Sequence, residues 1–126
     1  YEIVLCLWEM RELWEYTKLE HENIANYLKN TTKNIFLVWE SMQKYALPII
    51  DNAKIFKNSK ILWKFLKDFL QNNQNKKYLI LFKWSQNTIF LEESVKAVLN
   101  DKNEVTKLCR QEEYWMNNKN KFFEKE

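Results

Sequence analysis

The chain has 126 residues, a formal net charge of +3, no glycine and one proline, Pro48. Glycine lets a backbone adopt positive φ or approach a phosphate closely. Its absence argues against a phosphate-cradling loop, a dinucleotide-binding fingerprint, a nucleophile elbow and tight Asn-Gly hairpins. The length and the 46% apolar share suit one domain. We expect a single domain over residues 1–126, excised from a longer protein because the chain starts at Tyr1.

Apolar spacing predicts an all-α fold, a single bundle of four to five helices. The first helix is expected from about Glu2 to Leu28, because apolar side chains recur alternately four and three residues apart. The segment Asn30-Thr31-Thr32 breaks this helix and caps a second one, which ends at Pro48 because proline lacks a backbone donor. Residues 49–56 are expected to form a short helix or turn.

A third helix is expected after Ser59, which can serve as its N-cap, with apolar side chains from Ile61 to Leu70 turned inward. Residues 78–84 form a short apolar run that periodicity alone cannot assign. Helix is favoured there because no other segment offers a strand partner. The sequence leaves open whether this run is core or a ligand-binding strip.

Two more helices complete the predicted bundle. Thr88 is expected to cap a fourth helix that continues through Leu99, and its apolar face includes Leu91. Asp101 and Glu104 form a capping box for the last helix. No apolar run approaches the roughly 18 residues that a transmembrane helix needs, so we expect no transmembrane segment.

Few side chains are suited to catalysis. His21 is the only histidine, and we expect a hydrogen-bonded structural role for it. Cys6 and Cys109 are the only cysteines and are expected to be buried free thiols, with a single bridge between them as the alternative. Because no metal-ligand set or nucleophile–base pair is visible, we predict no enzyme, no catalytic residue, no metal and no cofactor.

Positive charge is concentrated in the middle of the chain. Residues 31–90 carry ten lysines against three acids, net +7, whereas residues 1–30 are net −3 and residues 91–126 are net −1. Five lysines recur every three or four residues: Lys54, Lys57, Lys60, Lys64 and Lys67. One continuous helix would align them on one face, unless Asn58-Ser59 interrupts it. Trp63 lies at the edge of the apolar stripe and is either an interface anchor or simple core packing.

A row of lysines with one sign of charge indicates either a solvated helix face or an anionic partner. An acidic protein segment is the partner that we favour. Nucleic acid is unlikely, because arginine, which makes bidentate contacts, occurs only as Arg11 and Arg110. An anionic membrane surface would add a weak contact of about 1 kcal/mol per lysine, since the opposite apolar face is needed for the core.

Three segments resemble a known family against a background rich in lysine and asparagine. They are Leu13-Trp14 with Glu20, Glu22 and Tyr27; Tyr45-Ala46-Leu47-Pro48-Ile49 before Leu62-Trp63; and Val105, Leu108 and Trp115 in the closing segment. This arrangement is similar to the PHIST (PRESAN) domain of malaria parasites. The resemblance implies an all-helical, non-enzymatic adaptor that is exported to the infected red cell. There it would bind host membrane-skeleton proteins or the acidic cytoplasmic tails of surface antigens.

The main functional hypothesis is therefore a helical adaptor whose lysine row and Trp63 contact an acidic protein segment. One alternative is a structural helical domain that self-associates through exposed aromatic side chains. Another is an enzyme or ligand pocket inside the bundle, which a deep cavity with convergent carboxylates would indicate.

Overall fold

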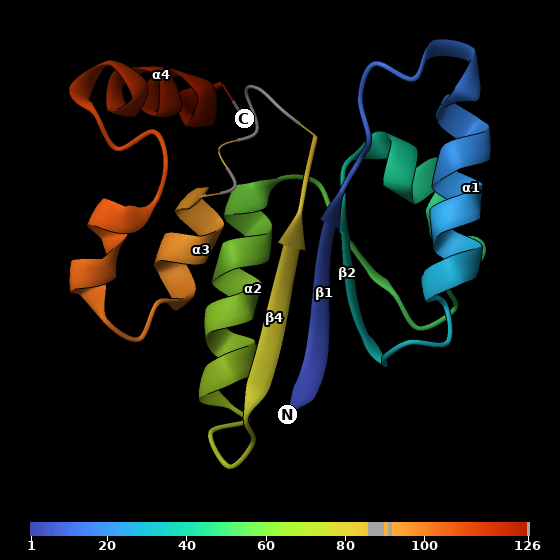
Figure 1. The fold of residues 1–126 in the computed structure, drawn as a ribbon, viewed down its shortest axis with the longest axis horizontal. Helices are drawn as coiled ribbons and strands as arrows, with labels where there is room; N and C mark the ends of the chain where they lie inside the picture. The colour runs from blue at the N-terminus through green and yellow to red at the C-terminus, as the bar shows by residue number, and fades with distance from the viewer. Residues whose placement is uncertain (86–89, 91, 126) are drawn as a thin grey trace.

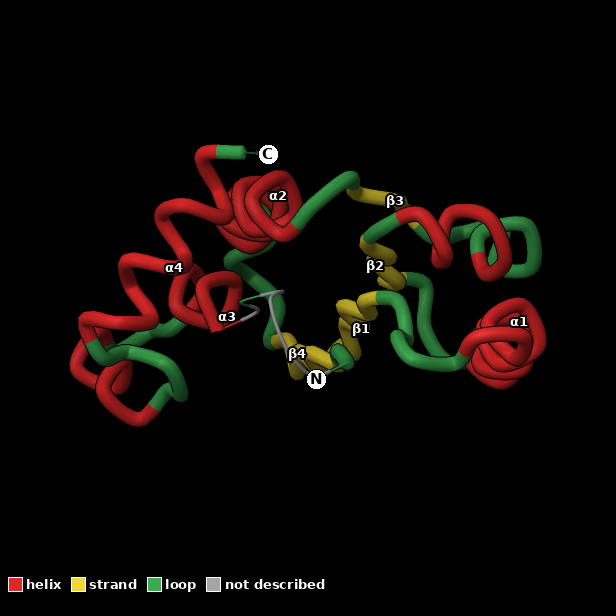
Figure 2. Tube along the Cα trace, turned by 90° about the horizontal axis from the view of Figure 1, so that it is seen from above, coloured by secondary structure: helices red, strands yellow, loops and turns green. Residues whose placement is uncertain are grey.

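The chain folds around four parallel strands, and the all-α prediction is wrong. The computed structural model describes residues 1–85, 90 and 92–125. The strands are β1 (Glu2–Trp8), β2 (Asn34–Val38), β3 (Lys54–Phe56) and β4 (Tyr78–Lys83). They lie side by side in the order β3-β2-β1-β4. Figure 1 labels β2, β1 and β4, and Figure 2 labels all four strands. β1 pairs with two neighbours, so that Val4 is opposite Asn34 of β2 and opposite Ile80 of β4.

Helical segments connect the strands and cover both faces of the sheet. Between the strands lie η1 (Trp14–Tyr16) with α1 (Thr17–Leu28), then η2 (Met42–Ala46), then α2 (Ser59–Gln71). After β4 come α3 (Glu92–Val98), η3 (Lys102–Lys107) and α4 (Glu113–Glu124). Figure 2 shows α1 on one side of the strands and α2 with α3 on the other. This is an α/β fold of the doubly wound kind, in which each crossover helix buries one face of a parallel sheet.

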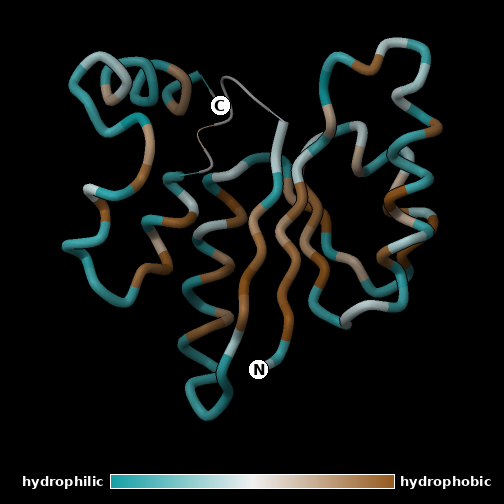
Figure 3. The backbone as a smooth tube through the Cα atoms, viewed as in Figure 1, coloured by the Kyte–Doolittle hydropathy of each residue, from teal (hydrophilic) through white to brown (hydrophobic). Residues whose placement is uncertain are grey.

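The core consists of two apolar layers that meet at the sheet. Val4 and Cys6 of β1 pack with Leu62 of α2 on one face. Leu5 of β1 packs with Ala25 of α1 on the other face. β1 and β2 are nearly continuous buried apolar runs because both of their faces are covered. β4 alternates, and its Leu79 and Leu81 are 61% and 54% exposed on the uncovered face. Figure 3 shows these runs as the most hydrophobic part of the chain.

The helix predicted from Glu2 to Leu28 is wrong in its first half, which is β1 and a loop. A run in which nearly every position is apolar fits a helical period as well as a strand period. The length of the apolar run distinguishes a strand from a helix, since strands commonly have about 5–6 residues. The helix predicted over residues 78–84 is wrong for the same reason. The strand partner that this segment needed is Glu2–Trp8, which the prediction had placed in a helix.

The middle of the chain also differs from prediction. The expected second helix divides into β2 and the single turn η2, which ends before Pro48, and the short helix or turn expected over residues 49–56 includes β3. The third helix is confirmed as α2, but its N-cap is Asn58 and not Ser59. The Asn58 side-chain oxygen accepts a hydrogen bond from the Ile61 backbone N–H at 3.0 Å.

The structure describes only part of the predicted fourth helix, and it places the predicted cap of the last helix elsewhere. Thr88 and Leu91 lie outside the described residues, and the described helix in this region is α3. Asp101 caps η3 and not the last helix, because its carboxylate accepts from the Asn103 backbone N–H at 2.8 Å. In the part of the chain that the structure describes, no helix has the length and apolar character needed to span a membrane.

α2 fixes the layer of helices on its face of the sheet. Leu62 and Leu66 are fully buried against the strands, and the rings of Phe65 and Phe69 pack edge-on against Phe36 of β2. Ile61, which the sequence placed inward, is 46% exposed. The buried stripe of α2 is therefore narrower than the apolar pattern suggested.

We predict that Leu66→Ala lowers the free energy of unfolding by about 2–5 kcal/mol, because it removes transfer energy and leaves a cavity. Ile61→Ala on the same helix is the control and should change the free energy by less than about 1 kcal/mol. Urea denaturation followed by circular dichroism measures both. Equal losses would contradict the docking face described for α2.

Candidate anion-binding pocket at the carboxyl edge of the sheet

The parallel arrangement brings the carboxyl ends of all four strands to one edge of the sheet. In open α/β sheets, ligands bind outside these ends, typically at the point where the strand order reverses, which here lies between β1 and β4. The pocket described below lies at the same edge, next to the ends of β2 and β3. Here the residue after β2 contacts the last residue of β3, because the Trp39 backbone N–H donates to the Phe56 carbonyl at 3.1 Å. The sheet ladder thus continues one residue past β2 and brings Trp39 close to the start of α2.

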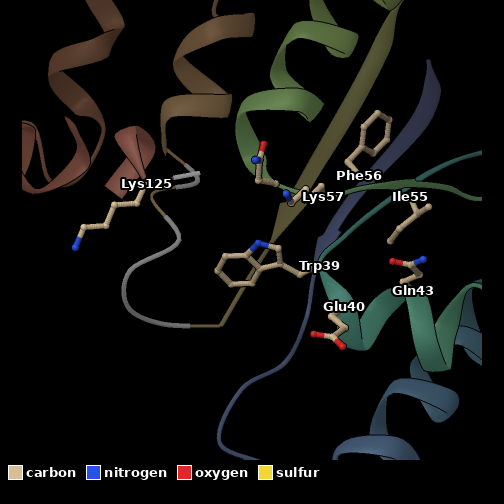
Figure 4. Close-up of a pocket in the computed structure, with 8 residues that line it drawn as sticks. Trp39, Glu40, Gln43, Ile55, Phe56, Lys57 and Lys125 are labelled. Carbon is tan, nitrogen blue, oxygen red and sulfur yellow. The ribbon is translucent and has the colours of Figure 1, made fainter. Parts of the chain in front are cut away.

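A pocket of about 580 Å³ opens at this edge. Its lining comes from the ends of β2 and β3, from η2, from the first residues before α2 and from the C-terminal segment (Figure 4). The lining residues are Trp39, Glu40, Gln43, Ile55, Phe56, Lys57, Asn58 and Lys125. The volume is in the range of small-molecule sites.

The electrostatics of one wall favour an anion. α2 begins at Ser59, directly after Lys57 and Asn58, so the positive end of its dipole lies at the pocket. Lys57 is exposed and, in the described part of the chain, forms no ion pair with a carboxylate. Glu40 contributes the opposite charge from the β2 side. The side chain of Lys125 extends outward from the rim in Figure 4.

Contacts between the loops stabilise the edge. The Ser41 backbone N–H donates to the Glu9 carboxylate at 3.1 Å, which joins the loop after β1 to the loop after β2. The Arg11 guanidinium lies 4.4 Å from the centre of the Trp39 ring, a cation–π distance. The buried Trp8 indole N–H donates to the Ser59 hydroxyl at 2.9 Å and joins β1 to the start of α2.

His21 holds the loop after β1 against α1. The side chain is fully buried, and its Nε2 accepts from the Met10 backbone N–H at 3.0 Å. Its Nδ1 lies 2.6 Å from the Thr17 carbonyl oxygen, which accepts a hydrogen bond if this nitrogen carries the proton. Both ring nitrogens thus contact backbone groups, which agrees with the structural role expected from the sequence.

A buried ionic cluster attaches α4, and with it Lys125, to α3. Lys119 is 1% exposed, and its amine lies 2.8 Å from Glu93 Oε1 and 3.1 Å from Glu92 Oε1. The same amine donates to the Arg110 carbonyl at 2.7 Å. Arg110 in turn donates two hydrogen bonds to Glu92, at 2.9 and 2.7 Å. This bidentate pair and the lysine amine satisfy charges that would be costly if buried alone.

The pKa values of the cluster reflect these contacts. Burial opposes ionisation of Glu92, but hydrogen bonds from Arg110 and Lys119 outweigh it, so the pKa of Glu92 lies below its ordinary value of 4.5. The hydrogen bond to Glu92 raises the pKa of Arg110. Both shifts favour the charged forms of Glu92 and Arg110 at neutral pH.

We predict that Glu92→Gln lowers the free energy of unfolding at pH 7 by about 3 kcal/mol, because it leaves buried cationic groups short of a partner. A carboxyl whose folded pKa is depressed stabilises the fold above its unfolded pKa, and this contribution is lost as the pH falls through the folded pKa. The wild type should therefore lose stability below about pH 4.5 more steeply than the variant.

Urea titrations between pH 3 and 7 measure this difference. Glu104→Gln is the control, because the Glu104–Lys107 pair is exposed and contributes about 0–1 kcal/mol. Identical pH dependence of the wild type and Glu92→Gln would contradict the role given to the cluster.

The structure divides the predicted lysine row. Lys54 is the first residue of β3, and its amine lies 5.2 Å from the Phe65 ring centre. Lys57 lines the pocket. The other three, Lys60, Lys64 and Lys67, lie on the exposed side of α2. The row is interrupted at Asn58-Ser59, where β3 gives way to α2, as one alternative in the sequence analysis allowed.

Trp63 packs within the molecule. Its ring centre lies 5.7 Å from that of Phe123, so it contributes to the contact between α2 and α4. The side chain is half-buried. The cysteines are both free, with Cys6 buried and Cys109 exposed, so the expectation that both are buried is wrong for Cys109. Burial raises the pKa of the Cys6 thiol and makes it a poor nucleophile.

Sequence reasoning missed most of the pocket. Trp39, Glu40 and Gln43 lay inside a predicted helix, and Lys125 had no assigned role. The signal that could have found them is the polar residue that follows each short apolar run. Among the described residues, no group of three or more histidine, cysteine, aspartate or glutamate side chains is placed to hold a metal ion.

Comparison with known proteins identifies the fold. The solved structure of MurF from Acinetobacter baumannii superposes with a TM-score of 0.64 at 18% sequence identity. The match covers 85% of this chain and 22% of the MurF chain, so this chain spans about a fifth of that protein. The likeness assigns a Rossmann-like fold and corrects the predicted helical bundle. No protein-family model and no curated protein matches the sequence.

Proposed function

We propose that the chain is a ligand-binding domain of a larger ligase of the MurF kind, and that its pocket binds an anionic group of a substrate. The observation that carries the proposal is the place of the pocket, at the carboxyl ends of parallel strands and at the N-terminus of α2. That edge is where α/β sheets bind ligands, and a helix N-terminus favours phosphate or carboxylate.

Two further points support this assignment. MurF is a ligase, and a domain of the present fold forms part of it. Lys57 is exposed at the pocket, where its ammonium group can reach an anion without first leaving a carboxylate partner. Among the described residues that line the pocket, Glu40 is the single carboxylate, and they include no nucleophile–base pair. The domain therefore binds and orients, while other parts of the larger protein supply the reacting groups.

We predict that the chain binds ATP and inorganic phosphate, and that Lys57→Glu weakens this binding by about tenfold or more. A charge-assisted hydrogen bond contributes about 1.5–3 kcal/mol, and 1.4 kcal/mol corresponds to tenfold. Titration followed by ¹⁵N NMR gives the affinity, and the shifted amides should include those of residues 57–60. Perturbation of the Trp39 indole signal locates the ligand at the pocket.

Lys67→Glu is the matched control, because it makes the same change of charge two helical turns along α2 and faces solvent. It should leave the affinity within about twofold of the wild type. If neither ATP nor phosphate shifts any signal from the pocket, or if both variants weaken binding equally, the proposed site is wrong.

A second candidate function is the adaptor expected from the sequence. The all-helical fold that the PHIST (PRESAN) resemblance implies is wrong, but exposure of the lysines favours an anionic contact on α2. In the described part of the chain, Lys60, Lys64 and Lys67 are exposed and form no ion pair. Their face is separate from the pocket. An acidic segment of a host membrane-skeleton protein or surface antigen remains the partner that this hypothesis names, with export to the red cell as its setting.

We predict for this candidate that the wild type binds a poly-glutamate peptide at low salt, and that the triple variant Lys60→Glu, Lys64→Glu and Lys67→Glu does not. Fluorescence anisotropy measures the binding, and raising the salt to about 0.5 M should abolish it, since exposed charges are screened. Lys57→Glu is the control and should retain most of the binding. Peptide binding that survives the triple variant would remove α2 as the contact.

A further inference from the structure

Two tryptophans occupy backbone positions that suit glycine. Trp14 has φ of 45° and Trp39 has φ of 81°, both in the left-handed region. In that region the Cβ atom of an L-residue approaches a carbonyl oxygen too closely, so residues other than glycine are disfavoured. A bulky residue with such a φ is a rare outlier. Trp14 follows the loop after β1, and Trp39 directly follows β2.

Neither side chain is buried as a core tryptophan is, and the ring of Trp14 least of all. Trp14 is 80% exposed, so its ring gains little from burial. Trp39 is half-buried: it packs at the margin of the core cluster that includes Val38 and Phe56, and Arg11 lies over its ring at a cation–π distance. A tryptophan retained for packing is expected to resemble Trp8, which is 1% exposed and hydrogen-bonded to Ser59.

The amino-acid composition also indicates that glycine is missing from positions that need it. Average glycine usage of about 7% would place about nine glycines in a chain of this length, yet it contains none and has six tryptophans. Asparagine is the next best residue for left-handed backbone. None of the chain's asparagines occupies a positive-φ position among the described residues, where the occupants are Glu12, Trp14, Trp39, Phe90 and Arg110. The fold thus has glycine positions, and tryptophan stands at two of them.

We propose that positions 14 and 39 are glycine positions, and that the cell in which this protein is made inserts glycine there. Glycine and tryptophan codons differ by one base, and genetic codes differ in whether UGA is read as stop, tryptophan or glycine. Glycine at these two positions accounts for both backbone angles and for part of the glycine deficit and of the tryptophan excess.

Glycine at position 39 would also change the pocket, although the evidence for it does not depend on the proposed function. Glycine at position 39 removes the indole from the lining. It also allows a ligand to approach the backbone after β2 closely, because glycine has no Cβ. This consequence, unlike the inference itself, rests on the proposed anion site.

The first test compares glycine with alanine at each position. The variants are Trp14→Gly and Trp14→Ala, Trp39→Gly and Trp39→Ala, with Trp63→Gly and Trp63→Ala as controls. Each pair removes the same indole, so the difference within a pair isolates the backbone term. Trp63 lies inside α2, where glycine is the worse residue.

At positions 14 and 39, the glycine variant should have a folded-to-unfolded ratio about fivefold or more above that of the alanine variant. At position 63 the order should reverse, by about fivefold. Because Trp14 is exposed, its pair should fold even if the pair at position 39 does not. Alanine variants as stable as glycine variants at position 14 would overturn the proposal.

The second test is direct. The protein isolated from its source organism is digested with trypsin, and tandem mass spectrometry sequences the peptides that span residues 12–18 and 34–44. Glycine at positions 14 and 39 is the expected result. Tryptophan at either position would overturn the proposal, whatever the phosphate titrations give.

Discussion

The pairing of β1 with β2 on one side and with β4 on the other is the interaction on which the rest of the structure depends. It places the first seven-residue segment of the chain at the centre of the sheet, between strands that come much later in the sequence. Because all pairs are parallel, each connection has to cross the sheet, and helices then cover both faces. The same geometry brings the strand ends, and therefore the pocket, to one edge.

Two kinds of polar contact extend this apolar framework. At the carboxyl edge, backbone and side-chain hydrogen bonds such as Ser41 to Glu9 fix loops that have no regular structure. On the far side of α2, the cluster around Lys119 and Glu92 attaches the last helix through charges with almost no exposure. Buried ion pairs contribute little net stability relative to apolar packing, but they cost several kcal/mol when one partner is lost. They therefore determine where α4 lies more than how stable the domain is.

The function follows from the site rather than from the fold. Rossmann-like domains serve many chemistries, so likeness to MurF at 18% identity describes the architecture alone. What distinguishes this chain is a pocket with Lys57 and the N-terminus of α2 on one wall, and a separate lysine face farther along the same helix. The ligands that we propose for these two surfaces differ, a small anion in the first case and an extended acidic segment in the second. Because the pocket lining and the face formed by Lys60, Lys64 and Lys67 have no residue in common, their roles can be tested separately.

Local sequence determined those features that depend on neighbouring residues. The amphipathic pattern of residues 59–71 fixed α2, Pro48 limited the turn before it, and His21 had too few partners for a metal site. The lysine pattern also included Lys57, the one pocket residue that the sequence singled out. Strand identity was decided by tertiary structure, because a short apolar run such as Tyr78–Lys83 becomes a strand only when a partner lies beside it. That partner is more than seventy residues away along the chain. The pocket depends on the same long-range pairing, so Trp39, Asn58 and Lys125 could be brought together only by the fold.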